Sequence, residues 1–144
     1  MTTGEIRAKG ILRRFRRIDA WFVAKSGLNL YRGCSHDCAY CDGRAEKYRV
    51  EGGFGTQVQV KTNAVEILAR ELVPKRAGAQ PRWAGYVVLG GGVGDSYQPA
   101  EERHGLARRT LELLETLGVP VVAVFGPTDP RRTGPVQPPS DHIR

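Results

Sequence analysis

The sequence predicts an α/β fold built on a parallel sheet, and two observations support this prediction. Two continuous apolar runs, residues 86–89 and residues 119–124, are typical of strands buried on both faces. Between them a leucine stripe at helical spacing begins after Pro99 and stops at Gly118. Strand, helix and strand within about 40 residues form a βαβ unit, whose crossover connection joins parallel strands.

The segments before this unit predict shorter elements. Residues 28–31 and residues 58–61 alternate between apolar and polar side chains, which is typical of short strands. Asn63, followed three residues later by Glu66, has the spacing of a helix N-cap in a capping box. Apolar side chains then recur on one face, so we expect an amphipathic helix over residues 64–73.

Composition divides the chain into three parts: a basic N-terminal extension (1–21), the α/β domain (22–124) and a tail (125–144). The tail is rich in Pro and Arg and has few large apolar side chains, so we expect it to be disordered. Of the net charge of +7, residues 1–49 carry +6, from 11 Lys+Arg and 5 Asp+Glu. Basic residues interleaved with aromatics suit contact with nucleic acid, and a solvated basic face is the alternative.

The cysteines indicate the cellular compartment and the kind of chemistry. All three lie within eight residues, and an odd number cannot pair fully in disulfides. This pattern is typical of a reduced compartment and of a metal or redox site. No run approaches the roughly 18 apolar residues of a membrane helix, and the N-terminus carries arginines instead of a signal-peptide core. We therefore expect a soluble, cytoplasmic protein with no membrane partner.

The cysteine loop has the spacing Cys34-x3-Cys38-x2-Cys41. A closed structural zinc site needs four ligands, so zinc would require His36 or His104 in addition to the three thiolates. A [4Fe-4S] cluster held by three thiolates would instead leave one iron open to an exogenous small molecule. Both alternatives are open at this point.

The same loop resembles a known signature. The three cysteines, with aromatic Tyr40 before the last one, resemble the motif of the radical S-adenosylmethionine (SAM) superfamily. Residues 28–44, residues 61–63 and residues 95–101 are similar to its branch related to the DNA-repair enzyme spore photoproduct lyase. The resemblance spans about residues 20–124. It implies that the domain is the N-terminal part of a partial (β/α)6 radical SAM barrel with a parallel sheet.

The resemblance also implies roles for individual residues. Cys34, Cys38 and Cys41 would ligate the [4Fe-4S] cluster, and SAM would chelate the fourth iron and be cleaved by one electron to a 5′-deoxyadenosyl radical. Tyr40 matches the aromatic position beside the adenine; packing of the loop is its alternative role. The glycine stretch that binds the SAM amino group is matched by Gly90, Gly91 and Gly92.

One position departs from the family pattern. The acidic residue often found directly after two glycines is absent, and the nearest candidates are Asp95 and Ser96. A carboxylate accepts hydrogen bonds from an ammonium group, so Asp95 is the expected contact to SAM, and a turn-forming aspartate is the alternative.

The resemblance implies a lyase-like radical SAM enzyme with an electron donor of the flavodoxin or ferredoxin type and with DNA as a candidate partner. About half of the barrel and any fourth cysteine are missing from these 144 residues, so we expect an N-terminal fragment of a longer enzyme. The alternative is a non-catalytic iron-sulfur or zinc-binding module whose basic N-terminus contacts nucleic acid.

Overall fold

The structure is a computed structural model that describes residues 2–18, 20, 23–45, 52–73, 76, 87–89 and 94–122. The chain divides into two compact units, Met1–Ala107 and Arg108–Arg144. The elements in chain order are β1 (Thr2–Ile6), β2 (Leu12–Arg14), β3 (Ser26–Leu28), β4 (Tyr31–Arg32), the short 3-10 helix η1 (Asp42–Arg44), β5 (Gln57–Lys61), α1 (Ala64–Leu72), β6 (Val87–Leu89), α2 (Ala100–His104) and α3 (Leu106–Thr116).

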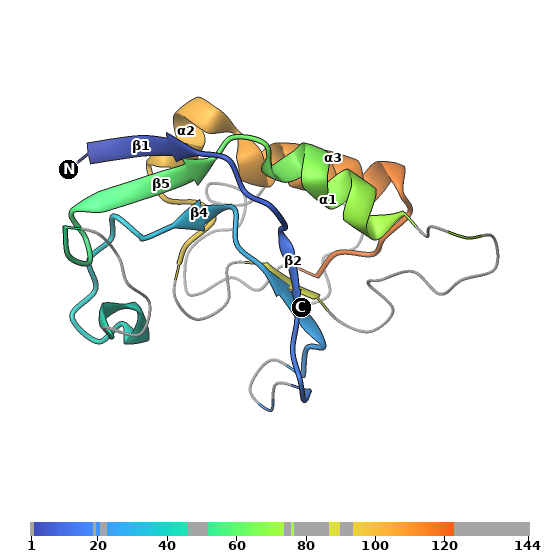
Figure 1. Ribbon diagram of the computed structural model, residues 1–144, viewed down its shortest axis with the longest axis horizontal. Helices are drawn as coiled ribbons and strands as arrows, with labels where there is room; N and C mark the ends of the chain where they lie inside the picture. The colour runs from blue at the N-terminus through green and yellow to red at the C-terminus, as the bar shows by residue number, and fades with distance from the viewer. Residues whose placement is uncertain are drawn as a thin grey trace. The chain divides into compact units, whose positions relative to one another are not determined.

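All described strands belong to the first unit and form two three-stranded sheets. In the first sheet the order is β1-β5-β4, with β1 parallel and β4 antiparallel to β5. Figure 1 shows β1 lying along β5 before the chain turns into β2. In the second sheet the order is β2-β3-β6, with β2 antiparallel and β6 parallel to β3. Each sheet is therefore mixed.

The expected parallel sheet of a partial (β/α)6 barrel is wrong for the described part of the chain. Each described sheet contains an antiparallel pair, β2 with β3 and β4 with β5, whereas a (β/α) barrel joins parallel neighbours by crossover connections. Asn29 and Leu30 break the expected strand over residues 28–31 and direct its halves into different sheets. The parallel β3–β6 pair is the part of the expectation that the structure retains.

The first 21 residues, which composition marks as a basic extension, contribute β1 and β2 to the two sheets. Two side chains hold the segment between these strands. The Asn63 amide donates to the Ala8 carbonyl oxygen at 3.0 Å and accepts from the Ala8 N–H at 2.8 Å. The Glu71 carboxylate accepts from the backbone N–H groups of Ile11 and Leu12 at 3.1 and 2.7 Å. Both side chains belong to α1 or to its N-cap position.

Helix α1 confirms the helix expected over residues 64–73, and Asn63 is its N-cap residue by position. The prediction of a capping box is wrong, because the Asn63 side chain makes no hydrogen bond to the first turn of the helix. Its amide is used by Ala8 instead. A contact that is distant in sequence thus replaces the local one.

The core of the first unit contains the buried side chains of β5, α1 and α2. Val58 and Val60 alternate with partly exposed residues in β5 and are fully buried, as a strand with one covered face requires. Helix α1 buries Ala64, Ile67, Leu68 and Leu72. Helix α2 packs against β5, and the buried Tyr31 hydroxyl of β4 donates to Glu101 of α2.

The single helix expected after Pro99 is divided into α2 and α3 at Gly105, whose φ of 56° lies in the left-handed region that glycine tolerates. In the second unit α3 ends as expected before Gly118, where φ is 65°. Residues 119–122 form no strand, which corrects the expected strand there; the rest of that run and the tail at 125–144 lie outside the described residues. No helix within the described ranges is long and apolar enough to cross a membrane.

Candidate functional site

The cysteine loop begins directly after β4 and carries three free cysteines. Cys34 is buried, with 6% of its surface exposed, while Cys38 and Cys41 are half-buried. The second half of the loop is a series of tight turns. Cys41 N–H donates to the Cys38 carbonyl oxygen at 3.1 Å, and Arg44 N–H donates to that of Cys41 at 3.2 Å. All three expected ligands therefore share one folded loop.

The sulfur environment has features that suit an iron-sulfur cluster. The Cys41 sulfur accepts a hydrogen bond from the Gly43 N–H at 3.4 Å, and hydrogen bonds to ligand sulfurs are one way that proteins tune such clusters. Three soft thiols in eight residues are also the donor set that such a cluster takes.

The three sulfurs are not gathered as ligands. Within the described ranges no group of three or more His, Cys, Asp or Glu side chains is placed to hold a metal ion. Neither histidine weighed as a zinc ligand completes such a group: His36 pairs with Asp95 at 3.2 Å, and His104 ends α2. A metal would have to draw the three thiols together, so the cluster stays a prediction.

Arg44 fixes the C-terminal half of the loop. Its guanidinium donates to the carbonyl oxygens of Cys38 and Asp37 at 3.0 and 2.8 Å, and it pairs with the Asp37 carboxylate at 2.6 Å. The same guanidinium lies over the Phe54 ring, 5.4 Å from its centroid, in a cation-π contact. A Cβ at Gly43 would come within 2.6 Å of that ring, so glycine is needed there. Arg44 thus links the middle of the loop to the turn before β5.

Gln98 fixes the N-terminal half of the loop. Its side-chain oxygen accepts from the Ser35 N–H at 3.2 Å, and its amide nitrogen donates to the carbonyl oxygens of Gly33 and Asp95 at 3.4 and 3.1 Å. Sequence reasoning missed this residue, and the one available signal was its place in the string of residues 95–101 that carries the family resemblance. A glutamine between a tyrosine and a proline gives no sign of a distant backbone partner.

The residues expected to contact SAM differ from one another in exposure and in hydrogen bonding. Tyr40 is 92% exposed, and a hydrogen bond to the Cys38 side chain raises the pKa of its hydroxyl. Asp95 is exposed and already engaged, because one carboxylate oxygen pairs with His36 and the other accepts from the Tyr97 N–H. Ser96 is buried. Gly90, Gly91 and Gly92 lie outside the described residues.

A small pocket brings part of this set next to the start of the loop. Its lining residues are Asn29, Leu30, Tyr31, Gly94, Asp95 and Ser96, and it has room for about one water molecule. Nearby, Lys61 Nζ donates to the Asn29 carbonyl oxygen at 2.6 Å. Burial, and secondarily the Arg32 charge, lower the pKa of Lys61. The structure thus joins Asp95 and Ser96 to the chain entering the cysteine loop.

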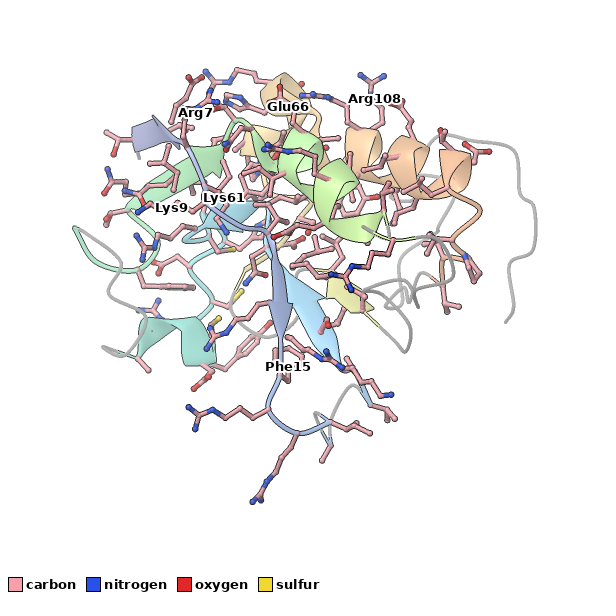
Figure 2. The ribbon with its side chains drawn as sticks, turned by 45° about the vertical axis from the view of Figure 1, so that its right-hand side comes forward. Arg7, Lys9, Phe15, Lys61, Glu66 and Arg108 are labelled. Carbon is pink, nitrogen blue, oxygen red and sulfur yellow. The ribbon has the colours of Figure 1, made fainter. Side chains whose placement is uncertain are left out.

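The first residues of the chain form a basic surface. Arg7 and Lys9 are exposed between β1 and β2 (Figure 2). Four further exposed arginines follow at positions 13, 14, 16 and 17. Residues 7–17 hold these six basic side chains and no acidic one; we name them the basic segment. None of the six forms an ion pair or side-chain hydrogen bond with another described residue.

Comparison with known proteins finds relatives without an assigned activity. The chain is 35% identical over 113 residues to uncharacterized proteins of Mycobacterium bovis and of two strains of Mycobacterium tuberculosis. The match covers 76% of this chain and 32% of each relative, so the chain spans about a third of their length. No family model and no solved structure matches it.

Proposed function

We propose that this chain is a radical SAM protein that holds a [4Fe-4S] cluster through Cys34, Cys38 and Cys41 and supports reductive cleavage of SAM. The observation that carries the proposal is the loop itself: three free thiols lie within eight residues, with Gln98 of a distant segment bonded to one half of the loop and the adjacent Arg44 bonded to the other. When bound, the cluster would pass one electron from a flavodoxin- or ferredoxin-type donor to the sulfonium of SAM. We propose DNA as the substrate class.

The protein's own residues would bind and orient the cofactor. Asp95 and Ser96 are proposed to hold the amino acid part of SAM, because both lie beside the chain that enters the cysteine loop. Asp95 can accept from an ammonium group only by sharing oxygens that already serve His36 and Tyr97. Tyr40, whose side chain is 92% exposed, is proposed to cover the adenine. Gly90, Gly91 and Gly92 are proposed to contact the amino group.

Anaerobic reconstitution with iron and sulfide tests this proposal. We expect a brown protein with about four irons per chain and, with dithionite and SAM, release of 5′-deoxyadenosine. Cys34→Ser, Cys38→Ser and Cys41→Ser should each abolish both, whereas Ser35→Ala on the same loop should retain the cluster. A colourless protein that binds one zinc would overturn the proposal. A cluster that never cleaves SAM would reduce it to the non-catalytic iron-sulfur module.

The basic segment supports a second candidate function, binding of single-stranded nucleic acid. Six exposed basic side chains without acidic neighbours within the segment present an electrostatic footprint for a phosphate backbone. Phe15 lies among them where the chain leaves β2, and its N–H is bonded to the Lys25 carbonyl oxygen at 2.9 Å (Figure 2). Arginine, which supplies five of the six, binds phosphate in a bidentate geometry. Aromatic stacking adds affinity for unpaired bases.

Fluorescence anisotropy with a labelled oligonucleotide tests this second function. We expect binding that weakens with salt, and replacement of the four arginines 13, 14, 16 and 17 by Gln should lower the salt slope by about 3. Replacement of the exposed Arg108 and Arg109 in the second unit is the matched control and should leave the slope within about 1. Binding that is independent of salt, or equal binding to anionic lipid vesicles, would contradict it.

A further inference from the structure

Gln98 is a buried amide with an unusual set of partners. Only 1% of its surface is exposed, and its side chain makes three hydrogen bonds, all with backbone groups. Two of these groups, the Gly33 carbonyl oxygen and the Ser35 N–H, belong to the residues on either side of Cys34. The third is the Asp95 carbonyl oxygen, in the segment that follows β6. One side chain therefore bonds to the residues on both sides of Cys34. It connects them to a segment that is distant in sequence, since Gln98 lies 63 residues after Ser35.

The chain at Cys34 has little other means of support. Regular structure ends with β4 at Arg32, and within the described ranges residues 34–37 form no backbone-backbone hydrogen bond. Gly33 adopts a φ of 81°, which turns the chain sharply at this point. The His36–Asp95 pair also connects the two segments, but both side chains are more than 40% exposed, and such pairs contribute little. The buried amide is the stronger link.

We propose that Gln98 is the positioning residue for Cys34: it holds this thiol buried and in place, and it couples the cysteine loop to the segment that carries Asp95 and Ser96. The reason for this positioning rests on the proposed function, because it takes Cys34 as a ligand of the cluster. The geometry explains why Cys34 is buried while Cys38 and Cys41 are half-exposed. Those two lie in the half of the loop that Arg44 holds.

The three thiols give an internal comparison for the test. In the metal-free, reduced chain of 144 residues, alkylation by iodoacetamide is followed separately at each cysteine by mass spectrometry. In Gln98→Leu, which keeps the bulk and removes all three hydrogen bonds, we expect Cys34 to react about tenfold faster, as the loss of buried hydrogen bonds implies. Cys38 and Cys41 should change less than about twofold. Gln98→Asn keeps the neutral amide and withdraws it by one methylene, so it should give a smaller increase at Cys34.

Asn63→Ala is the matched control, because it removes another buried amide that bonds to backbone, in this case to Ala8. It should leave the ratio of Cys34 to Cys38 reactivity unchanged. Should Gln98→Leu not fold, Gln98→Asn decides the question by the same ratio. Equal acceleration of all three thiols, or none at Cys34, would overturn the positioning role.

A separate measurement tests the role of Gln98 in cluster assembly. If the wild-type chain takes up a cluster, Gln98→Leu should hold less iron per chain after reconstitution and release it faster to a chelator, and unchanged retention would overturn this part of the inference. If the wild-type chain takes up no cluster, the proposed function fails, while the thiol ratios still report whether Gln98 positions Cys34.

Discussion

Glu71 offers a direct test of how the N-terminal strands are attached to the rest of the first unit. Its carboxylate, near the end of α1, accepts from the backbone N–H groups of Ile11 and Leu12 at 3.1 and 2.7 Å, and both of these residues are buried. Hydrogen bonds to a charged group contribute about 1.5–3 kcal/mol each, and a buried donor left without a partner is costly. Glu71→Ala should therefore lower the free energy of unfolding by about 2–4 kcal/mol.

The assay is denaturant unfolding combined with amide hydrogen exchange. Glu66→Ala is the matched control, since Glu66 is exposed on the same helix (Figure 2), and it should change stability by less than about 0.5 kcal/mol. In Glu71→Ala the amides of Ile11 and Leu12 should exchange faster, while those in the middle of α1 are affected less. Equal unfolding free energies for the two variants, or unchanged exchange at Ile11 and Leu12, would refute the attachment.

Two further predictions concern the surroundings of the cysteine loop. Gly53 and Gly55 both have left-handed backbone, with φ of 91° and 87°, but a Cβ at Gly55 would come within 2.3 Å of Asp37 while one at Gly53 meets nothing within 4 Å. Gly55→Ala should therefore destabilise the chain by about 1–3 kcal/mol more than Gly53→Ala in thermal unfolding, and equal losses would contradict the contact. Burial and then the hydrogen bond to Glu101 raise the pKa of Tyr31 far above its ordinary value of 10.0. Since the unfolded chain ionises first, stability should be complete below pH 10 and fall above it by up to about 1.4 kcal/mol per pH unit. Tyr31→Phe should make this alkaline decline shallower, and an identical pH profile would show that Tyr31 does not cause it.

Local patterns predicted several elements because the signals lie within a few residues. The alternation at residues 58–61 marks β5, and the apolar spacing after Asn63 marks α1. The apolar run before the glycines at 90–92 contains β6. Such periodicities report which face of an element is covered, and that is sufficient to identify the element.

The pairing of strands and the use of polar side chains could not be predicted in this way. Nothing near Thr2–Ile6 indicates that this segment pairs with β5, because its partner lies about 55 residues away, as in the pair Thr2 and Gln57. Asn63 has the sequence environment of a helix cap, yet its amide serves Ala8. Gln98 has no sequence signal that indicates its hydrogen bonds beside Cys34, other than its place in the string of residues 95–101. Each depends on a partner that folding brings near.

By itself the sequence determined the three thiols in one loop, the basic segment, and the positions of α1 and β5. These follow from residue type and short-range spacing, which fix donor chemistry, charge and amphipathic faces before any folding. Only the tertiary structure decided that the sheets are mixed, that the first residues are strands, and that buried Gln98 brackets Cys34. The physical reason is that backbone donors and acceptors must all be satisfied in the folded chain, and the partner that satisfies each is chosen by proximity in space.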